Sequence, residues 1–152
     1  MQNHNLKLKT FNFELMGFLD FIFKKRKKYS RYRYSRLSLS QFDVRKIADE
    51  WGRVEELVKL GQPSQLRQAV IKADSLLDFA LSRLTTGATM GERLKNARAY
   101  FKNSVVYQGL WQAHKVRNAL VHEADYEPTH TLIRDAIAKF KRGLEALGAE
   151  LE

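Results

Sequence analysis

Apolar residues recur at intervals of three and four over most of the chain, and this spacing places them on one face of an α-helix. No segment shows the alternation of apolar and polar residues that is typical of a half-buried strand. Amphipathic helices joined by short connections pack as antiparallel neighbours. The sequence therefore predicts an all-α fold, an antiparallel up-and-down bundle of about five helices. The expected helices lie at residues 40–61, 63–84, 89–101, 109–122 and 129–147.

Cap and turn residues mark where these helices begin and end. Ser40, followed by Asp43 in the first turn, is expected to cap the first helix, and Gly61 is expected to end it. The proline that closes segment 124–128 disfavours helix in the residue before it, so this segment should separate the last two helices. Residues 102–107 are expected to form a link or an irregular lead-in to the fourth helix.

The net charge of +10 is concentrated in one short segment. Residues 24–36, KKRKKYSRYRYSR, hold eight Lys or Arg and no acid, and they directly follow an apolar run at residues 11–23, FNFELMGFLDFIF. The remainder of the chain is close to neutral, so the total charge says little about what the folded part binds. A chain of 152 residues has room for one domain with a hydrophobic core. We therefore expect an N-terminal arm at residues 1–39 and a helical bundle at residues 40–150.

Three interpretations of the arm remain open. The apolar run is 13 residues long, shorter than the roughly 20 that span a bilayer, but together with the basic segment it suits an anionic membrane surface, contacted through residues 11–36. Cations interleaved with tyrosines also suit single-stranded RNA, through phosphate pairing and base stacking. The third interpretation is a flexible linker or an extra helix docked on the bundle. The cations concerned are Lys24, Lys25, Arg26, Lys27, Lys28, Arg31 and Arg33.

Several classes of site are disfavoured by what the sequence lacks. There is no cysteine, which excludes disulfides, thiolate metal sites and a cysteine nucleophile, and which fits a reducing compartment. The sequence contains no zinc-ligand spacing, glycine-rich phosphate loop or serine nucleophile motif. We therefore expect no metal and no cofactor. The expected location is cytoplasmic, peripheral to the inner face of the membrane if the arm contacts lipid.

The fourth predicted helix, GLWQAHKVRNALVHE, carries many polar groups beside its apolar stripe. His114, Asn118 and His122 are spaced four and four, so they line one side of the helix. Arg117 lies beside Asn118 and one turn from His114. A guanidinium matches phosphoryl oxygens, and an imidazole can accept or donate a proton near neutral pH. Such groups can catalyse transesterification of RNA without a metal.

The spacing of Arg117 and His122 limits this hypothesis. Residues five apart on a helix point about 140° away from each other around its axis. The two side chains can meet one ligand if the helix frays near His122, if Arg117 reaches round the helix, or if a second copy of the chain supplies one of them.

The stretch RNALVH at residues 117–122 resembles the motif of the HEPN superfamily of nucleotide-binding helical bundles, in which an Arg and a polar residue precede a His. The surrounding WQAHKVRNALVHE is similar to small bacterial HEPN-like proteins, and the resemblance covers residues 40–148. The resemblance implies an RNA or nucleotide ligand and a homodimer in which two motifs face each other. Many members of the superfamily are metal-independent endoribonucleases, and those of toxin systems have a cognate antitoxin as partner. By this resemblance, Arg117 would stabilise the charge of the phosphate, Asn118 would orient the phosphate or the imidazole, and His122 would be the acid or base.

A purely structural interpretation of the same residues remains open. Arg117 and Asn118 would bond acids or exposed carbonyls on neighbouring helices, and His122 would cap the end of its own helix. Asp74 and Asp78, one turn apart in the second predicted helix, are the expected partners of Arg117. The alternative function is then a non-enzymatic interaction module, tethered to a membrane surface or a partner through its arm.

Overall fold

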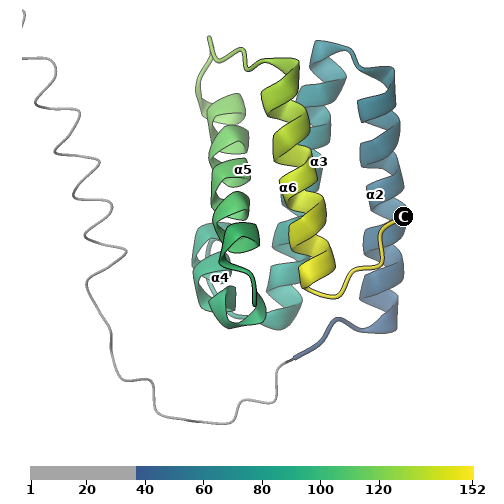
Figure 1. Cartoon of the computed structure of the whole chain (residues 1–152), viewed down its shortest axis with the longest axis vertical. Helices are drawn as coiled ribbons and strands as arrows, with labels where there is room; N and C mark the ends of the chain where they lie inside the picture. The colour runs from purple at the N-terminus through teal and green to yellow at the C-terminus, as the bar shows by residue number, and fades with distance from the viewer. Residues whose placement is uncertain (1–36) are drawn as a thin grey trace, which may run out of the picture. The chain divides into compact units, whose positions relative to one another are not determined.

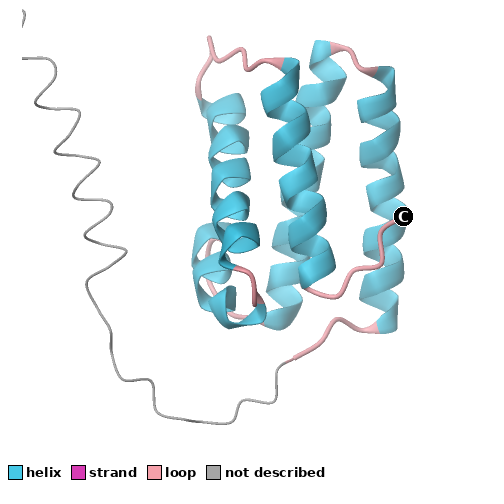
Figure 2. Ribbon diagram, viewed as in Figure 1, coloured by secondary structure: helices cyan, strands magenta, loops and turns pink. Residues whose placement is uncertain are grey.

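The computed structural model describes residues 37–152, so the predictions for the apolar run at 11–23 and the basic segment at 24–36 lie outside the described residues. No strand occurs between residues 37 and 152 (Figure 2). The predicted all-α fold is confirmed. The helices are α2 (Gln41–Leu60), α3 (Pro63–Leu84), α4 (Met90–Asn96), the 3-10 helix η1 (Ala97–Tyr100), α5 (Ser104–His122) and α6 (His130–Ala146).

The four long helices run alternately up and down, and the short α4 packs beside one end of α3 (Figure 1). α3 is central, because it packs against α2, α6 and α5, whereas α5 makes most of its contacts with α6. Trp51 is 3% exposed and belongs to the core. The largest side chains with no exposed area include Leu66, Leu77, Leu81, Leu110, Phe140 and Leu144. Within residues 37–152, no helix has both the length and the apolar character needed to cross a bilayer.

The predicted caps of α2 are confirmed. The Ser40 hydroxyl accepts a hydrogen bond from the Asp43 backbone N–H, and the Asp43 carboxylate accepts one from the Ser40 backbone N–H. This reciprocal pair satisfies two donors that a helix start would otherwise leave unpaired. Gly61 ends the helix with a φ of 71°, a left-handed conformation that glycine adopts without a steric penalty.

The prediction of a link at residues 102–107 is wrong for its larger part, because α5 begins at Ser104 and not near Gly109. The Asn103 side chain accepts a hydrogen bond from the Val105 backbone N–H and so caps the helix. Gly109 lies inside α5 at a close approach of α6, where an added Cβ would stand 3.3 Å from the Lys139 side chain. The glycine therefore marks helix packing and not a helix start.

Candidate functional site

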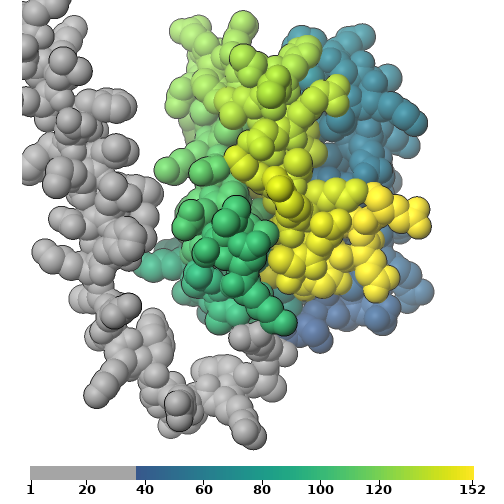
Figure 3. All heavy atoms as spheres, viewed as in Figure 1, coloured from purple at the N-terminus to yellow at the C-terminus, as the bar shows by residue number. Residues whose placement is uncertain are grey.

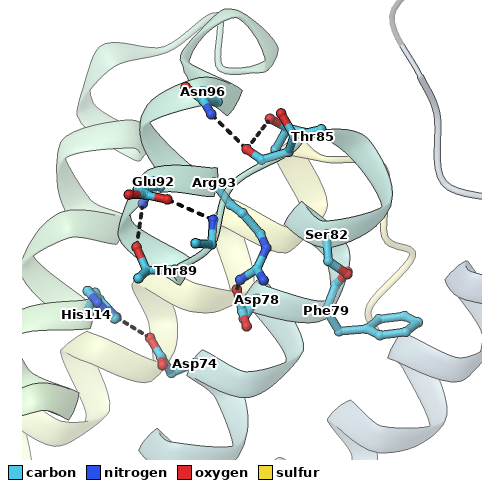
Figure 4. A network of polar contacts seen from close by, with 12 residues as sticks. Asp74, Asp78, Phe79, Ser82, Thr85, Thr89, Glu92, Arg93, Asn96 and His114 are labelled. Atoms are coloured by element: carbon cyan, nitrogen blue, oxygen red, sulfur yellow. Dashed lines mark hydrogen bonds and ion pairs between the residues drawn. The ribbon is translucent and has the colours of Figure 1, made fainter.

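Asp74 organises a polar cluster between α3 and α5. It is 3% exposed, and a carboxylate so far removed from water requires partners. His114 Nδ1 lies 2.7 Å from one carboxylate oxygen (Figure 4). Arg117 Nε lies 3.2 Å from the other, close enough for an ion pair although the angle is not that of a hydrogen bond. One buried carboxylate thus holds two side chains of α5, one helical turn apart.

Arg117 also contacts its neighbour in the sequence. Its Nη1 donates to Asn118 Oδ1 at 3.0 Å, so the amide and the Asp74 carboxylate contact different edges of the guanidinium. The Arg117 side chain nevertheless keeps 28% of its surface exposed. A guanidinium carries five N–H donors, and these two contacts leave others for a ligand. The arrangement fixes a positive charge at the surface of the bundle.

His122 lies apart from this cluster. It is the last residue of α5 and is exposed, and between residues 37 and 152 it forms no hydrogen bond or ion pair with Arg117. Its place five positions after Arg117 turns it about 140° around the helix axis, as the spacing predicts. The fold therefore brings Asp74, His114, Arg117 and Asn118 together, and it leaves His122 at the helix end.

Asp78 does not join the cluster either, although it is one turn from Asp74. Its carboxylate accepts a hydrogen bond of 2.7 Å from Arg93 of α4, which packs against this part of α3 (Figure 4). The prediction that acids of α3 hold Arg117 is therefore right for Asp74, whereas Asp78 ties α3 to α4.

Arg67 is a further residue of this region, and the sequence analysis did not identify it. Its Nη2 donates to the Leu120 carbonyl and its Nη1 to the Tyr126 carbonyl, each at 3.1 Å. It thereby satisfies a free carbonyl at the end of α5 and anchors the segment that follows His122. The signal was present, because Arg67, Asp74 and Asp78 are spaced seven and four along α3 and share the face that meets α4 and α5.

Comparisons with family models, with curated proteins and with solved structures find no match to this chain. Among residues 37–152, no group of three or more His, Asp or Glu side chains is placed to hold a metal ion. What the cluster can do chemically follows from its own groups: a positioned guanidinium can bind a phosphate, and Asp74 holds the imidazole of His114 beside it, whereas that of His122 lies outside the cluster.

Proposed function

We propose that this chain is a HEPN-like domain that acts on RNA through Arg117, Asn118 and His122, as a metal-independent endoribonuclease. Three observations support the proposal. The RNALVH stretch has the order of residues of that superfamily, the described residues form an all-α bundle, and the motif occupies the end of a long helix next to an acidic partner.

The observation that carries the proposal is the fixed orientation of Arg117. Asp74 contacts its Nε and Asn118 its Nη1, so its remaining N–H groups are oriented before any ligand arrives. A guanidinium held in this way binds a phosphate at a lower entropic cost than one on an unrestrained surface side chain.

The reaction that fits these groups is an internal phosphoryl transfer. The ribose 2′-oxygen bonds to the adjacent phosphorus as a base removes its proton, and the bond from phosphorus to the 5′-oxygen breaks as that oxygen takes up a proton. The products are a 2′,3′-cyclic phosphate and a 5′-hydroxyl. Arg117 stabilises the charge on the phosphoryl oxygens. His122 is either the base that accepts the 2′-hydroxyl proton or the acid that protonates the 5′-oxygen.

Because Arg117 and His122 point to different sides of α5, we propose that a second copy of the chain completes each site. The guanidinium of one copy then faces the imidazole of the other across a two-fold axis. This arrangement needs no fraying of α5 at Glu123, whose backbone N–H still donates to the Ala119 carbonyl.

The test is cleavage of a labelled single-stranded RNA by the full-length chain in buffer containing a metal chelator. We expect Arg117→Ala and His122→Ala each to lower the rate by a factor of about 100 or more, because each removes a group that acts in the transition state. His130→Ala and Arg142→Ala are matched controls, since both residues are exposed on α6. If both site variants cleave at the rate of the unaltered protein, the catalytic proposal is wrong.

A further inference from the structure

A hollow of about 480 Å³ lies between α2 and α6, on the side of α6 away from α5. The apolar residues that line it are Trp51, Val58, Ile137 and Ala138. It is separate from the cluster around Asp74, which lies between α3 and α5. An inference drawn from this groove therefore does not depend on the proposed ribonuclease.

The C-terminal segment runs beside one end of this groove. After α6 the chain crosses toward α2 (Figures 1 and 3). Its last residues line a second hollow together with Trp51 and Glu55, which also line the first. Ala149 is buried and Leu151 packs against the core, whereas Glu150 and Glu152 are exposed or lie at the rim. The chain itself thus shows what fits at one end of the α2–α6 groove: residues 149–152, in which apolar and acidic side chains alternate.

Cations surround the half that remains open. Lys141 forms an ion pair of 3.5 Å with Glu55 and also donates to the Glu152 carbonyl, at the end that the C-terminal segment reaches. At the other end, Arg134 Nη2 lies 3.5 Å from the Val58 carbonyl. Within residues 37–152, neither Arg134 nor Lys59 forms an ion pair with a carboxylate.

We propose that the open half of the α2–α6 groove binds an acidic segment of a partner protein, in an extended form with alternating apolar side chains. Its apolar side chains pack on Val58, Ile137 and Ala138, and its carboxylates pair with Lys59 and Arg134. These ion pairs give Lys59 and Arg134 the carboxylate partners that they lack within residues 37–152. The alternation of apolar and acidic side chains repeats that of residues 149–152 beside the groove.

A nucleic acid fits this groove less well than a peptide. Its one aromatic ring, Trp51, is 3% exposed, so no ring face is open for a base to stack on. An apolar floor with cations at its ends matches a chain that alternates apolar and acidic side chains.

The experiment measures fluorescence anisotropy of a labelled synthetic peptide that contains the sequence of residues 147–152, LGAELE, twice. We expect the full-length chain to bind it with a Kd of roughly 10–100 µM, the weak affinity of a small groove. Lys59→Glu/Arg134→Glu should weaken binding about tenfold or more, because two ion pairs become repulsions. Ala138→Tyr should also abolish binding, because the ring fills the groove from an exposed position.

The matched control is Arg45→Glu/Lys102→Glu, which makes the same change of net charge at two exposed residues outside the groove. It should bind the peptide as the unaltered chain does, and circular dichroism should show all variants to be equally helical. The proposal is overturned if the unaltered chain does not bind, if the control loses binding as fully as Lys59→Glu/Arg134→Glu, or if a peptide with lysine in place of each glutamate binds equally well. It is also overturned if a single-stranded oligonucleotide displaces the peptide and depends on the same two cations.

Discussion

Asp74 contacts two side chains of α5, His114 and Arg117, from a position of almost complete burial. Its side chain is 4% exposed, whereas that of Asp78, one turn along, is 38% exposed. Both carboxylates contact a neighbouring helix at 2.7 Å. The pair therefore separates the effect of burial from the effect of making an ion pair.

Asp74→Asn should lower the free energy of unfolding by about 2 kcal/mol, because it leaves Arg117 partly buried without its counter-charge. Asp78→Asn should cost less than about 1 kcal/mol, because Asp78 is 38% exposed and water already screens its ion pair with Arg93. Urea denaturation followed by circular dichroism measures both values. If both variants lose the same free energy of unfolding, the burial of Asp74 does not strengthen its contribution to stability.

Ser40 should make the stability of the chain depend on pH in the acid range. The hydrogen bond from the Ser40 side chain, followed by the Ser40 backbone N–H and the Arg83 charge, holds the pKa of Asp43 below its ordinary value. The unfolded chain then binds a proton more readily than the folded chain, so this stabilisation is complete above the ordinary pKa and is lost as the pH falls through the lowered one.

Ser40→Ala should therefore destabilise the chain by about 1 kcal/mol at pH 7, the usual cost of losing an N-cap. The difference from the unaltered chain should shrink below about pH 4, where carboxylates become protonated. Urea midpoints between pH 2.5 and pH 7 test this. A difference that stays constant over the whole range would contradict the assigned role of Asp43.

At the scale of the helix, the spacing of apolar residues predicted most helices correctly. It gave a wrong helix start where a glycine is present because two helices pack closely. The limits of α2 and α3 follow from Ser40, Gly61 and the apolar stripes, all of which act locally. The predicted start of α5 at Gly109 was wrong, because a glycine in a sequence resembles a helix break. In the structure it allows α6 to approach. A reading of one helix at a time contains no information about such a contact.

The candidate site was predictable to the same extent. The spacing of Asp74 and Arg117 in their helices allowed the pairing to be named in advance, and the structure brings these residues together. The hydrogen bonds from Arg67 to two carbonyls, and the position of the C-terminal segment beside α2, depend on how distant segments meet. No local pattern determines contacts of that kind.

Two helical glycines should respond to alanine in opposite directions. Gly52 has open space where a Cβ would stand, so Gly52→Ala should stabilise the chain by about 1 kcal/mol through helix propensity alone. At Gly143 a Cβ would stand 2.3 Å from a methyl group of Leu110, which is fully buried. Overpacking costs about 1–3 kcal/mol, so Gly143→Ala should destabilise the chain.

Thermal and urea unfolding of the two glycine variants provide the measurement, and each serves as the control for the other. A stabilising effect of Gly143→Ala would mean that Leu110 can move without cost.

At the scale of the whole molecule, we propose that a second copy of the chain completes each site. Arg117 is held on the side of α5 that faces Asp74, and His122 is exposed at the helix end. In a two-fold dimer each site would take its guanidinium from one copy and its imidazole from the other. The Arg117 guanidinium and the His122 imidazole of a single copy would then belong to different sites.

Mixing two inactive variants distinguishes a shared site from a site within one copy. We expect Arg117→Ala and His122→Ala chains, mixed in equal amounts and allowed to exchange, to recover about a quarter of the normal rate of RNA cleavage. Half of the dimers then contain one copy of each variant, and in each of these one of the two sites retains both groups. Light scattering checks that the mixture is dimeric. A mixture as inactive as its components would mean that each copy must supply both groups itself. This would require α5 to unwind near His122 or the Arg117 side chain to reach round the helix.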